Sequence, residues 1–354
     1  MKKILLTGGG TAGHVTPNIA LLPGLKALGF EIHYAGTASG IERELIEKTS
    51  VPFYAVSSGK LRRYLSFKNV TDVFKVVKGL ADANRLVKRL RPNICFSKGG
   101  FVTVPVVIAC WINKVPVIIH ESDMTMGLAN RITAKFANKI CVTFYETLAS
   151  ASKKKMVHTG APIRKELFFG ERKKGDELCC FSVQRPVVLV MGGSLGSVKI
   201  NNNLRQVLPS ILEKFNVIHI CGKNNLDQNL ELEGYRQFEY LNEELPHVLA
   251  MADIIISRAG SNAINEFLAL KKPALLVPLP KTGNSRGDQI DNAKAFSKHG
   301  FAEMLLEEEI TAETFVQSIF KLYNNRSMYI SAMKKSPAQD GTGQVLEVIK
   351  KEVI

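Results

Sequence analysis

The stretch Lys3-Ile4-Leu5-Leu6-Thr7-Gly8-Gly9-Gly10-Thr11-Ala12-Gly13-His14 places a short apolar run directly before a cluster of glycines. The same order returns in Pro186-Val187-Val188-Leu189-Val190-Met191-Gly192-Gly193-Ser194-Leu195-Gly196, and a helical pattern follows each stretch. Glycine lets the backbone turn tightly and approach a ligand, and the N–H groups at a helix N-terminus attract phosphate. Two such stretches in one chain predict two similar α/β domains that hold a ligand between them.

Strand-like and helical runs alternate outward from both stretches. Strands are expected at residues 4–7, 31–35, 53–56, 94–97, 115–120, 140–143 and 156–159, and then at 187–191, 217–221, 237–240, 254–257, 274–278 and 302–305. Helices are expected from about Pro17, at 40–49 and 68–90, before Trp111 and at 344–354. Strands that alternate with helices form a parallel sheet covered on both faces, so we expect one such sheet in each half. Residues 160–184 show no clear period and are expected to connect the two domains.

Length and composition favour two domains of an ordinary globular protein. The chain has 354 residues, which exceeds what one core usually holds. A net charge of +15 indicates either an anionic partner, such as nucleic acid, membrane or phosphorylated ligand, or a solvated lysine-rich surface. The six cysteines form no C-x-x-C pair and are expected to be buried, reduced thiols of a cytoplasmic protein. We expect no signal peptide, because the N-terminus runs straight into a strand, and no membrane-spanning helix, because no apolar run reaches about 18 residues.

The first glycine cluster matches the dinucleotide fingerprint Gly8-x-Gly10-x-x-Gly13. That fingerprint expects an acidic residue at the end of the second strand, but Tyr34-Ala35-Gly36-Thr37 contains none, which disfavours a nicotinamide cofactor. His14 follows the glycines directly, and an imidazole there can act as a base or contact phosphate. The alternative is a histidine that only caps the helix.

Polar residues follow two further strands of the first half. Lys98-Gly99-Gly100-Phe101 follows the fourth, and Glu121-Ser122-Asp123 follows the fifth. Carboxyl ends of parallel strands are where such sheets bind ligands, so Lys98, Glu121 and Asp123 are expected to share a site with His14. Taken alone, the two carboxylates could be helix caps.

In the second half, Arg258-Ala259-Gly260-Ser261 leads from a strand into a helix that carries Glu266. A carboxylate in this place can accept two hydrogen bonds from a ribose diol, although a solvated helix glutamate would look the same. The polar loop 281–288 and the following Gln289 and Asn292 offer amide groups that suit sugar hydroxyls, as would an ordinary surface loop.

A basic and partly apolar stretch covers residues 60–91. Val70, Val73, Phe74 and Val77 recur there at helical spacing among lysines and arginines. They could be ordinary core. Together with Trp111 they could instead rest on an anionic membrane surface.

Together and in this order, these motifs resemble the GT-B glycosyltransferases of family 28, which transfer N-acetylglucosamine (GlcNAc) from UDP-GlcNAc to lipid I in peptidoglycan synthesis. The resemblance covers essentially the whole chain. It rests on Gly9-Gly10-Thr11-Ala12-Gly13-His14, Gly99-Gly100-Phe101-Val102, His120-Glu121, Gly160-Ala161-Pro162-Ile163-Arg164, Gly192-Gly193-Ser194-Leu195-Gly196, Gly260-Ser261 with Glu266, and Gln289 with Asn292.

The resemblance implies a GT-B fold, with two Rossmann-like doubly wound parallel-sheet domains facing a cleft. Residues 1–163 would take the lipid acceptor and associate with the membrane, and a C-terminal helix at 337–354 would pack back on them. Residues 164–336 would bind UDP-GlcNAc. No cofactor is implied, and the absence of an Asp-x-Asp motif disfavours an obligatory metal.

The same resemblance implies residue roles. His14 is the preferred catalytic base, with Glu121 and Asp123 as competitors. His14, Lys98, Gly99 and Gly100 would meet the acceptor, with Thr11, Ala12 and Gly13 lining the same side of the cleft. The residues expected near the donor are Thr11, Ala12, Gly13, Asp123, Arg164, Ser194, Leu195, Gly196, Asn242, Ser261, Glu266, Gln289 and Asn292. Asp123 and Asp288 stand where the family often has amides, and a carboxylate lacks the amide's donors.

The expected partners are UDP-GlcNAc, undecaprenyl-diphosphate-MurNAc-pentapeptide (lipid I) and an anionic membrane surface at the cytoplasmic face, without nucleic acid. A GT-B enzyme that glucosylates diacylglycerol is the nearest alternative. A UDP-GlcNAc 2-epimerase would share the architecture without needing a lipid. A nucleotide-binding regulator that uses the basic face for nucleic acid would explain the charge, but not His14, Glu121 and the polar loop around Gln289.

Overall fold

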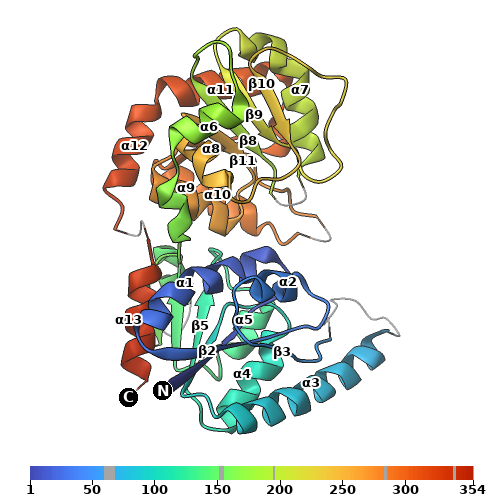
Figure 1. Ribbon diagram of the computed structural model, residues 1–354, viewed down its shortest axis with the longest axis vertical. Coiled ribbons are helices and arrows are strands. Elements are labelled where there is room, and N and C mark those ends of the chain that lie inside the picture. Colours follow the sequence, from blue (N-terminus) through green and yellow to red (C-terminus); the bar gives the residue numbers. More distant parts are fainter. Residues whose placement is uncertain (60–67, 151–154, 194–195, 283–284, 338–339, 354) are drawn as a thin grey trace. The chain divides into compact units, whose positions relative to one another are not determined.

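The computed structural model describes residues 1–59, 68–150, 155–193, 196–282, 285–337 and 340–353, and it leaves out the side chains of residues 68–75, 149 and 150. The chain forms two compact units (Figure 1). Unit 1 consists of Met1–Arg164 and Asp340–Ile354, and unit 2 consists of Lys165–Gln339. Within these described ranges, no helix is both long and apolar enough to cross a membrane.

Unit 1 is built on a parallel sheet with the strand order β3-β2-β1-β4-β5-β6-β7. Its strands are β1 (Lys2–Thr7), β2 (Phe30–Gly36), β3 (Phe53–Ala55), β4 (Ile94–Ser97), β5 (Val117–Glu121), β6 (Lys139–Val142) and β7 (Met156–His158). Its helices are η1 (Ala12–His14), α1 (Thr16–Ala27), α2 (Ile41–Glu47), α3 (Lys68–Leu90), α4 (Thr103–Ile112), α5 (Leu128–Thr133), η2 (Tyr145–Ser150) and α13 (Thr342–Glu352).

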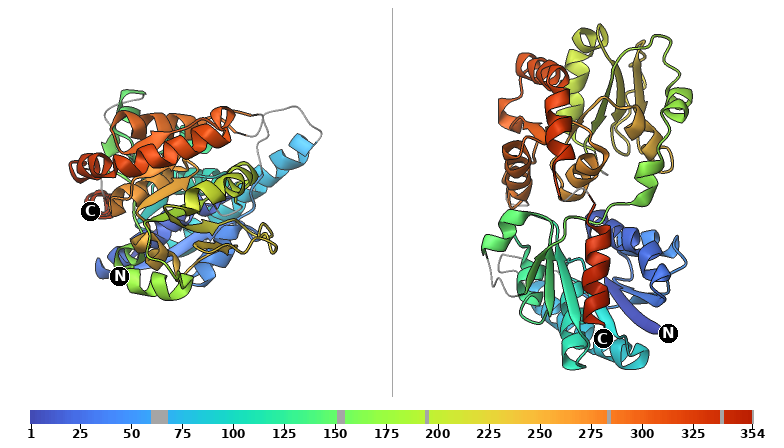
Figure 2. Two further views of the ribbon diagram at one scale, coloured as in Figure 1. Left: turned by 90° about the horizontal axis from the view of Figure 1, so that it is seen from above. Right: turned by 90° about the vertical axis from the view of Figure 1, so that its left-hand side faces the viewer.

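Side chains along β1 point alternately to the two faces of the sheet, so the apolar core of unit 1 has two parts, one on each face. Leu5 packs with residues of α3 and α4 on one face, and Ile4 and Leu6 pack with residues of α1, α2 and α13 on the other. Figure 2 shows α13 lying along this second face, where it contacts α1. Both faces of the strands are therefore buried, as a parallel sheet requires.

Unit 2 repeats the architecture with the order β10-β9-β8-β11-β12-β13, again parallel. Its strands are β8 (Val187–Met191), β9 (Asn216–Ile220), β10 (Tyr235–Phe238), β11 (Ile254–Ser257), β12 (Ala274–Leu276) and β13 (Ala302–Met304). Its helices are η3 (Lys165–Phe169), α6 (Arg172–Cys179), α7 (Val198–Leu212), α8 (Leu245–Met251), α9 (Ser261–Leu270), α10 (Asp288–Lys298), η4 (Glu307–Glu309), α11 (Ala312–Asn324) and α12 (Arg326–Lys334). Residues of α7, α11 and α12 form one apolar cluster with the sheet, and α8 packs against β8.

The stretch 160–184, predicted to connect the two domains, contains the boundary between the units, at Arg164 and Lys165. It also contains η3 and α6, and α6 packs against α8. The buried face of α6 consists of Gly175 and Cys179, which is too small to produce an apolar period. Cys180, which ends this helix in a left-handed backbone conformation, is exposed, so the prediction of a buried thiol is wrong for this residue. The other five cysteines are buried and free, as expected.

Candidate functional site

The glycine loop after β1 and the loop after β4 lie side by side at the carboxyl edge of the unit 1 sheet. This is the point where the strand order reverses, since β1 lies between β2 and β4. The Gly9 N–H donates to the Gly99 carbonyl over 3.2 Å. Gly100 has φ +91°, and a Cβ on it would lie 2.1 Å from the Gly9 carbonyl oxygen. The two loops can approach this closely only because both consist of glycines, and such a crevice is where open α/β sheets bind ligands.

A buried carboxylate holds the glycine loop in place. One oxygen of Glu42 accepts from the Thr37 N–H (2.9 Å) and its hydroxyl (2.5 Å), and the other accepts from the Gly10 N–H (3.1 Å). Burial opposes the charge of this carboxyl group, but the hydrogen bonds from Thr37 and Gly10 outweigh it and lower the pKa of Glu42. Glu42 therefore holds the glycine loop in its ionised form.

We expect Glu42→Gln to lower the free energy of unfolding of unit 1 by about 1–3 kcal/mol at pH 7, because an amide can replace only one of the two accepting oxygens. The lowered pKa means that the carboxylate stabilises the fold above its unfolded-state pKa and loses this effect as pH falls through the folded-state value. Urea unfolding curves should thus differ at pH 7 and converge in acid. Glu44→Gln, at an exposed position of the same helix α2, is the control and should change neither curve. An equal loss of unfolding free energy in Glu42→Gln and Glu44→Gln would contradict the role of Glu42 in holding the glycine loop.

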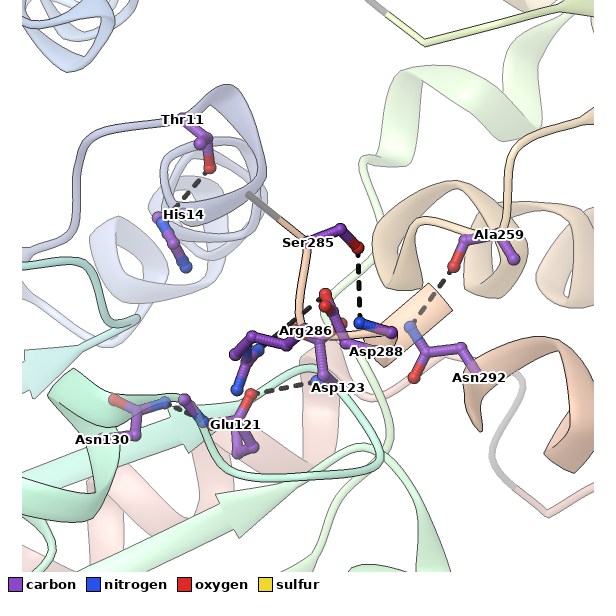
Figure 3. A network of polar contacts seen from close by, with 12 residues as sticks. Thr11, His14, Glu121, Asp123, Asn130, Ala259, Ser285, Arg286, Asp288 and Asn292 are labelled. Carbon is purple, nitrogen blue, oxygen red and sulfur yellow. Dashed lines mark hydrogen bonds and ion pairs between the residues drawn. The ribbon is translucent and has the colours of Figure 1, made fainter. Parts of the chain in front are cut away.

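His14 is oriented by the same loop. Its Nδ1 lies 3.0 Å from the Gly9 carbonyl oxygen. It also lies 3.2 Å from the Thr11 hydroxyl, as Figure 3 shows. A carbonyl only accepts, so the contact with Gly9 requires the proton on Nδ1 and leaves the lone pair on Nε2. A half-buried imidazole held in this way can accept a proton from a bound hydroxyl group.

Lys98 does not line a surface but is buried, with 1% of the residue exposed. Its ammonium donates to Nδ1 of His120 over 2.7 Å and to the Ser122 hydroxyl. Burial lowers the pKa of Lys98 to about 8, against the opposite effect of the Glu121 and Asp123 carboxylates. Burial and the Lys98 charge also lower the pKa of His120 well below its usual value, so its imidazole is neutral.

Glu121 holds the loop that follows β5. Its carboxylate accepts from the Asp123 N–H (3.0 Å), the Gly127 N–H (3.0 Å) and the Asn130 side-chain amide (2.9 Å). Figure 3 shows these contacts around the strand end. These three hydrogen bonds tie the loop that carries Asp123 and Gly127 to the end of β5.

The glycine loop after β8 approaches its neighbouring strand closely in unit 2. Gly196 has φ +75°, and a Cβ on it would lie 2.0 Å from the Cys221 carbonyl oxygen. The Ser197 hydroxyl then caps α7 by accepting from the Ile200 N–H over 3.3 Å. Helix N-termini of this kind, which follow a glycine loop, are where α/β proteins commonly bind phosphate groups. Ser194 and Leu195, which were expected to contact the donor, lie outside the described residues.

The loop after β11 lies beside this glycine loop, because β11 pairs with β8. Arg258 braces it by donating to the carbonyls of Val277 (3.2 Å) and Pro278 (3.3 Å) and by pairing with Glu307. Ser261 begins α9 and is buried, and Glu266 is half-buried further along this helix. The expected ribose-binding carboxylate therefore lies on the helix that starts at the switch point of the unit 2 sheet.

Two of the expected sugar-binding residues on α10 also hold neighbouring loops. The Gln289 side-chain oxygen accepts from the Leu279 N–H (3.0 Å), and the buried Asn292 amide donates to the Ala259 carbonyl (3.3 Å). Asp288 lies 3.8 Å from Arg286, in the first turn of α10, where a negative charge is favourable (Figure 3).

The other expected site residues lie in different surroundings. Asn242 is exposed and donates its N–H to the Glu244 carboxylate over 3.3 Å, between β10 and α8. Arg164 is half-buried and is the last residue of unit 1 before the chain enters unit 2. Val77 and Trp111 are 63% and 55% exposed. The side chains of Val70, Val73 and Phe74 lie outside what is described, although their backbone belongs to α3.

Sequence reasoning brought His14, the glycine loops, Glu121 and Asp123 to one edge of unit 1, and the structure agrees with that grouping. It missed Glu42, which lies beyond the end of the second strand, in α2, and not at the strand end where a dinucleotide fingerprint expects an acid. It also missed Asn130, whose amide donates to Glu121 and to the His120 carbonyl. In the part of the chain that is described, no group of three or more His, Cys, Asp or Glu side chains is arranged to hold a metal ion.

Comparison with known proteins covers both units. Residues 4–142 match the glycosyltransferase family 28 N-terminal domain, and residues 187–348 match the glycosyltransferase family 28 C-terminal domain. A protein of Clostridium tetani is 55% identical over 351 residues, covering 99% of this chain and 98% of its own. One of Clostridium botulinum strain Hall is 54% identical over 352 residues, 99% of each chain. Both are named UDP-N-acetylglucosamine–N-acetylmuramyl-(pentapeptide) pyrophosphoryl-undecaprenol N-acetylglucosamine transferase.

Solved structures agree. MurG of Acinetobacter baumannii superposes with a TM-score of 0.77 at 26% identity, covering 99% of this chain and 100% of the other. A UDP-N-acetylglucosamine 2-epimerase superposes with a TM-score of 0.70 at 12% identity, covering 99% of this chain and 95% of the other, which shows the shared fold alone.

Proposed function

Because this chain belongs to glycosyltransferase family 28, we propose that it transfers GlcNAc from UDP-GlcNAc to the MurNAc 4-hydroxyl of undecaprenyl-diphosphate-MurNAc-pentapeptide. The reaction converts lipid I to lipid II and inverts the anomeric carbon. The observation that carries this function is the identity of 55% along 99% of the chain to a transferase with that name. Nothing comparable favours a diacylglycerol glucosyltransferase.

In this proposal unit 2 binds the donor. The N-terminus of α7, reached through Gly196, takes the diphosphate through backbone N–H groups, with Ser194 and Leu195 in the same loop. Glu266 accepts from the ribose hydroxyls, and the backbone around Asn242 reads the uracil. The residues that bind the donor also include Gln289, Asn292 and Ser261. Gln289 offers its amide N–H groups to GlcNAc. Asp288, at the start of α10, pairs with Arg286.

Unit 1 binds the acceptor and supplies the base. Nε2 of His14 takes the proton of the MurNAc 4-hydroxyl as the oxygen attacks the anomeric carbon, and UDP leaves toward the α7 N-terminus. The contact between Nδ1 and the Gly9 carbonyl supports this role, since it puts the proton of the neutral ring on Nδ1 and the basic lone pair on Nε2. Glu121 positions the loop with Asp123, and Gly99 and Gly100 bring the backbone of the second loop against the glycine loop, next to the proposed acceptor site. Arg164 stands where the chain passes from one unit to the other.

We further propose that the protein works as a peripheral protein at the cytoplasmic face of the membrane. The exposed Val77 and Trp111 support a membrane-contacting patch on α3 and α4, to which Val70, Val73 and Phe74 would also belong. Basic residues along α3 favour anionic lipid.

The test is a transfer assay with labelled UDP-GlcNAc and lipid I in vesicles that contain anionic lipid. The disaccharide lipid is expected with lipid I and not with diacylglycerol. Product with diacylglycerol alone would establish the alternative acceptor, and release of free sugar epimer would point to an epimerase.

We expect Glu266→Ala to raise the KM for UDP-GlcNAc by about 10–100-fold while changing kcat much less, because it removes a charged hydrogen-bond acceptor from ground-state binding. Initial rates at varied donor and saturating lipid I measure both constants. Glu313→Ala, at an exposed position on α11 of the same unit, is the control. A donor KM equal to that of the control would remove Glu266 from the ribose role.

A further inference from the structure

The ends of β4 and β5 are joined by an unusual buried group, the Lys98 ammonium. Lysine has three donors and no acceptor, so the 2.7 Å contact with His120 requires Nδ1 of His120 to accept. The proton of this neutral imidazole is therefore on Nε2, which donates to the Gly160 carbonyl over 3.0 Å. The second Lys98 contact, to the Ser122 hydroxyl, fixes the loop that carries Asp123.

Gly160 is the point where this network meets the segments that enter and leave unit 1. Its carbonyl also accepts from the Thr159 hydroxyl over 3.0 Å. The returning chain lies against it, because the Gly341 N–H donates to the Ala161 carbonyl (2.8 Å). A Cβ on Gly341 would lie 2.4 Å from the Thr159 carbonyl oxygen. The Ile163 N–H then donates to the Thr342 hydroxyl over 3.0 Å.

We propose that Lys98 is a positioning residue for the acceptor side of the reaction, which acts through His120 and Ser122 to hold the loop 121–127 and the crossing segment at Gly160 in one arrangement. The inference rests on the proposed function, since it assigns that loop to lipid I. Lys98 itself does not touch substrate, because 1% of it is exposed and its ammonium points to protein partners.

The surroundings of Lys98 explain why a charged residue is needed at this buried position. The carboxylates of Glu121 and Asp123 attract the ammonium, while desolvation, the main effect on its pKa, opposes the charge. A neutral residue of the same length would leave Nδ1 of His120 buried without a donor. It would also free the Ser122 side chain from β4. The loop would then sample several arrangements, and only one of them presents Asp123 and the backbone of the loop to the acceptor.

The experiment compares Lys98→Met with Lys272→Met. Lys272 is a matched control, since its ammonium donates to two carbonyls, of Ala250 (3.1 Å) and Ala252 (2.7 Å), but lies in unit 2. We expect Lys98→Met to raise the KM for lipid I and lower kcat by about tenfold or more, with the KM for UDP-GlcNAc changed less than about twofold. Lys272→Met should lower the Tm and leave both KM values as they are. Equal changes in the two KM values of Lys98→Met, or no change in any kinetic constant, would overturn the proposal.

A second measurement is independent of activity. The ¹⁵N NMR shifts of His120 should report a neutral ring with the proton on Nε2 in the unaltered protein and a different tautomer population in Lys98→Met. Unchanged ¹⁵N shifts would overturn the proposal even if the kinetics change. A protein with the expected shifts but no transfer would refute the proposed function and leave the Lys98–His120 contact standing. If Lys98→Met does not fold, Ser122→Ala replaces it, with a rise in the lipid I KM expected and an unchanged KM overturning the proposal.

Discussion

Replacement of His14 by alanine is expected to lower kcat by about 10²–10⁴-fold, the usual contribution of a positioned general base. The KM for UDP-GlcNAc should hardly change, because the donor is assigned to unit 2 and His14 belongs to unit 1. The expectation follows from the contact of Nδ1 with the Gly9 carbonyl, which leaves Nε2 to accept a proton. Initial rates with varied UDP-GlcNAc and lipid I separate the two constants.

The pH profile adds a second test of the same residue. A general base works only in its neutral form, so kcat of the unaltered enzyme should rise with pH as His14 loses its proton, and His14→Ala should lose this limb. His158→Ala is the control, because that half-buried imidazole of unit 1 contacts only the Thr143 carbonyl (3.1 Å) among its described hydrogen bonds. A His14→Ala enzyme with normal kcat and a raised donor KM would show that His14 binds the donor instead.

The prediction of two parallel-sheet α/β domains is confirmed, and the reason lies in the strands themselves. Runs such as Val187–Met191 are apolar on both faces and are followed by glycines, a pattern that parallel strands share and that few other elements imitate. Expected strand ends differ from the observed ones by at most two residues, as at β10 and β12. The assignment to family 28 and its reaction is also confirmed, because it rested on many motifs in a fixed order.

What the sequence could not predict depends on contacts between distant residues. Lys98 was expected to line a cleft, since a lysine after a strand usually reaches solvent, yet it is buried against His120 and Ser122. Glu121 was placed at the same sheet edge as a competing base, but the three donors around its carboxylate could not be predicted. Both outcomes follow from how the loops fold over the strand ends, and no local pattern encodes that.

Gly196→Ala is expected to abolish measurable binding of UDP-GlcNAc, and the reason is geometric. The residue has φ +75°, so an alanine there costs about 1–2 kcal/mol of backbone strain. Its Cβ would in addition lie 2.0 Å from the Cys221 carbonyl oxygen, which belongs to the backbone and cannot swing away as a side chain could. The loop between β8 and α7 must therefore move away from the end of β9. The α7 N-terminus, which is proposed to hold the diphosphate, moves with it.

Gly300→Ala separates strain from displacement. Gly300 has φ +69° in the same unit, but a Cβ on it would meet the nearest atom, of Ala332, at an ordinary 3.6 Å. Calorimetric titration with UDP should show no binding to Gly196→Ala and normal binding to Gly300→Ala, while both lose thermal stability by about 2–4 °C per kcal/mol of strain. Normal UDP binding to a folded Gly196→Ala would mean that the diphosphate does not depend on this loop, and the donor site would have to be placed elsewhere in unit 2. The comparison is decisive because both variants place alanine in a left-handed backbone, but only in Gly196→Ala does the added methyl group collide with a neighbouring backbone and displace the loop before α7.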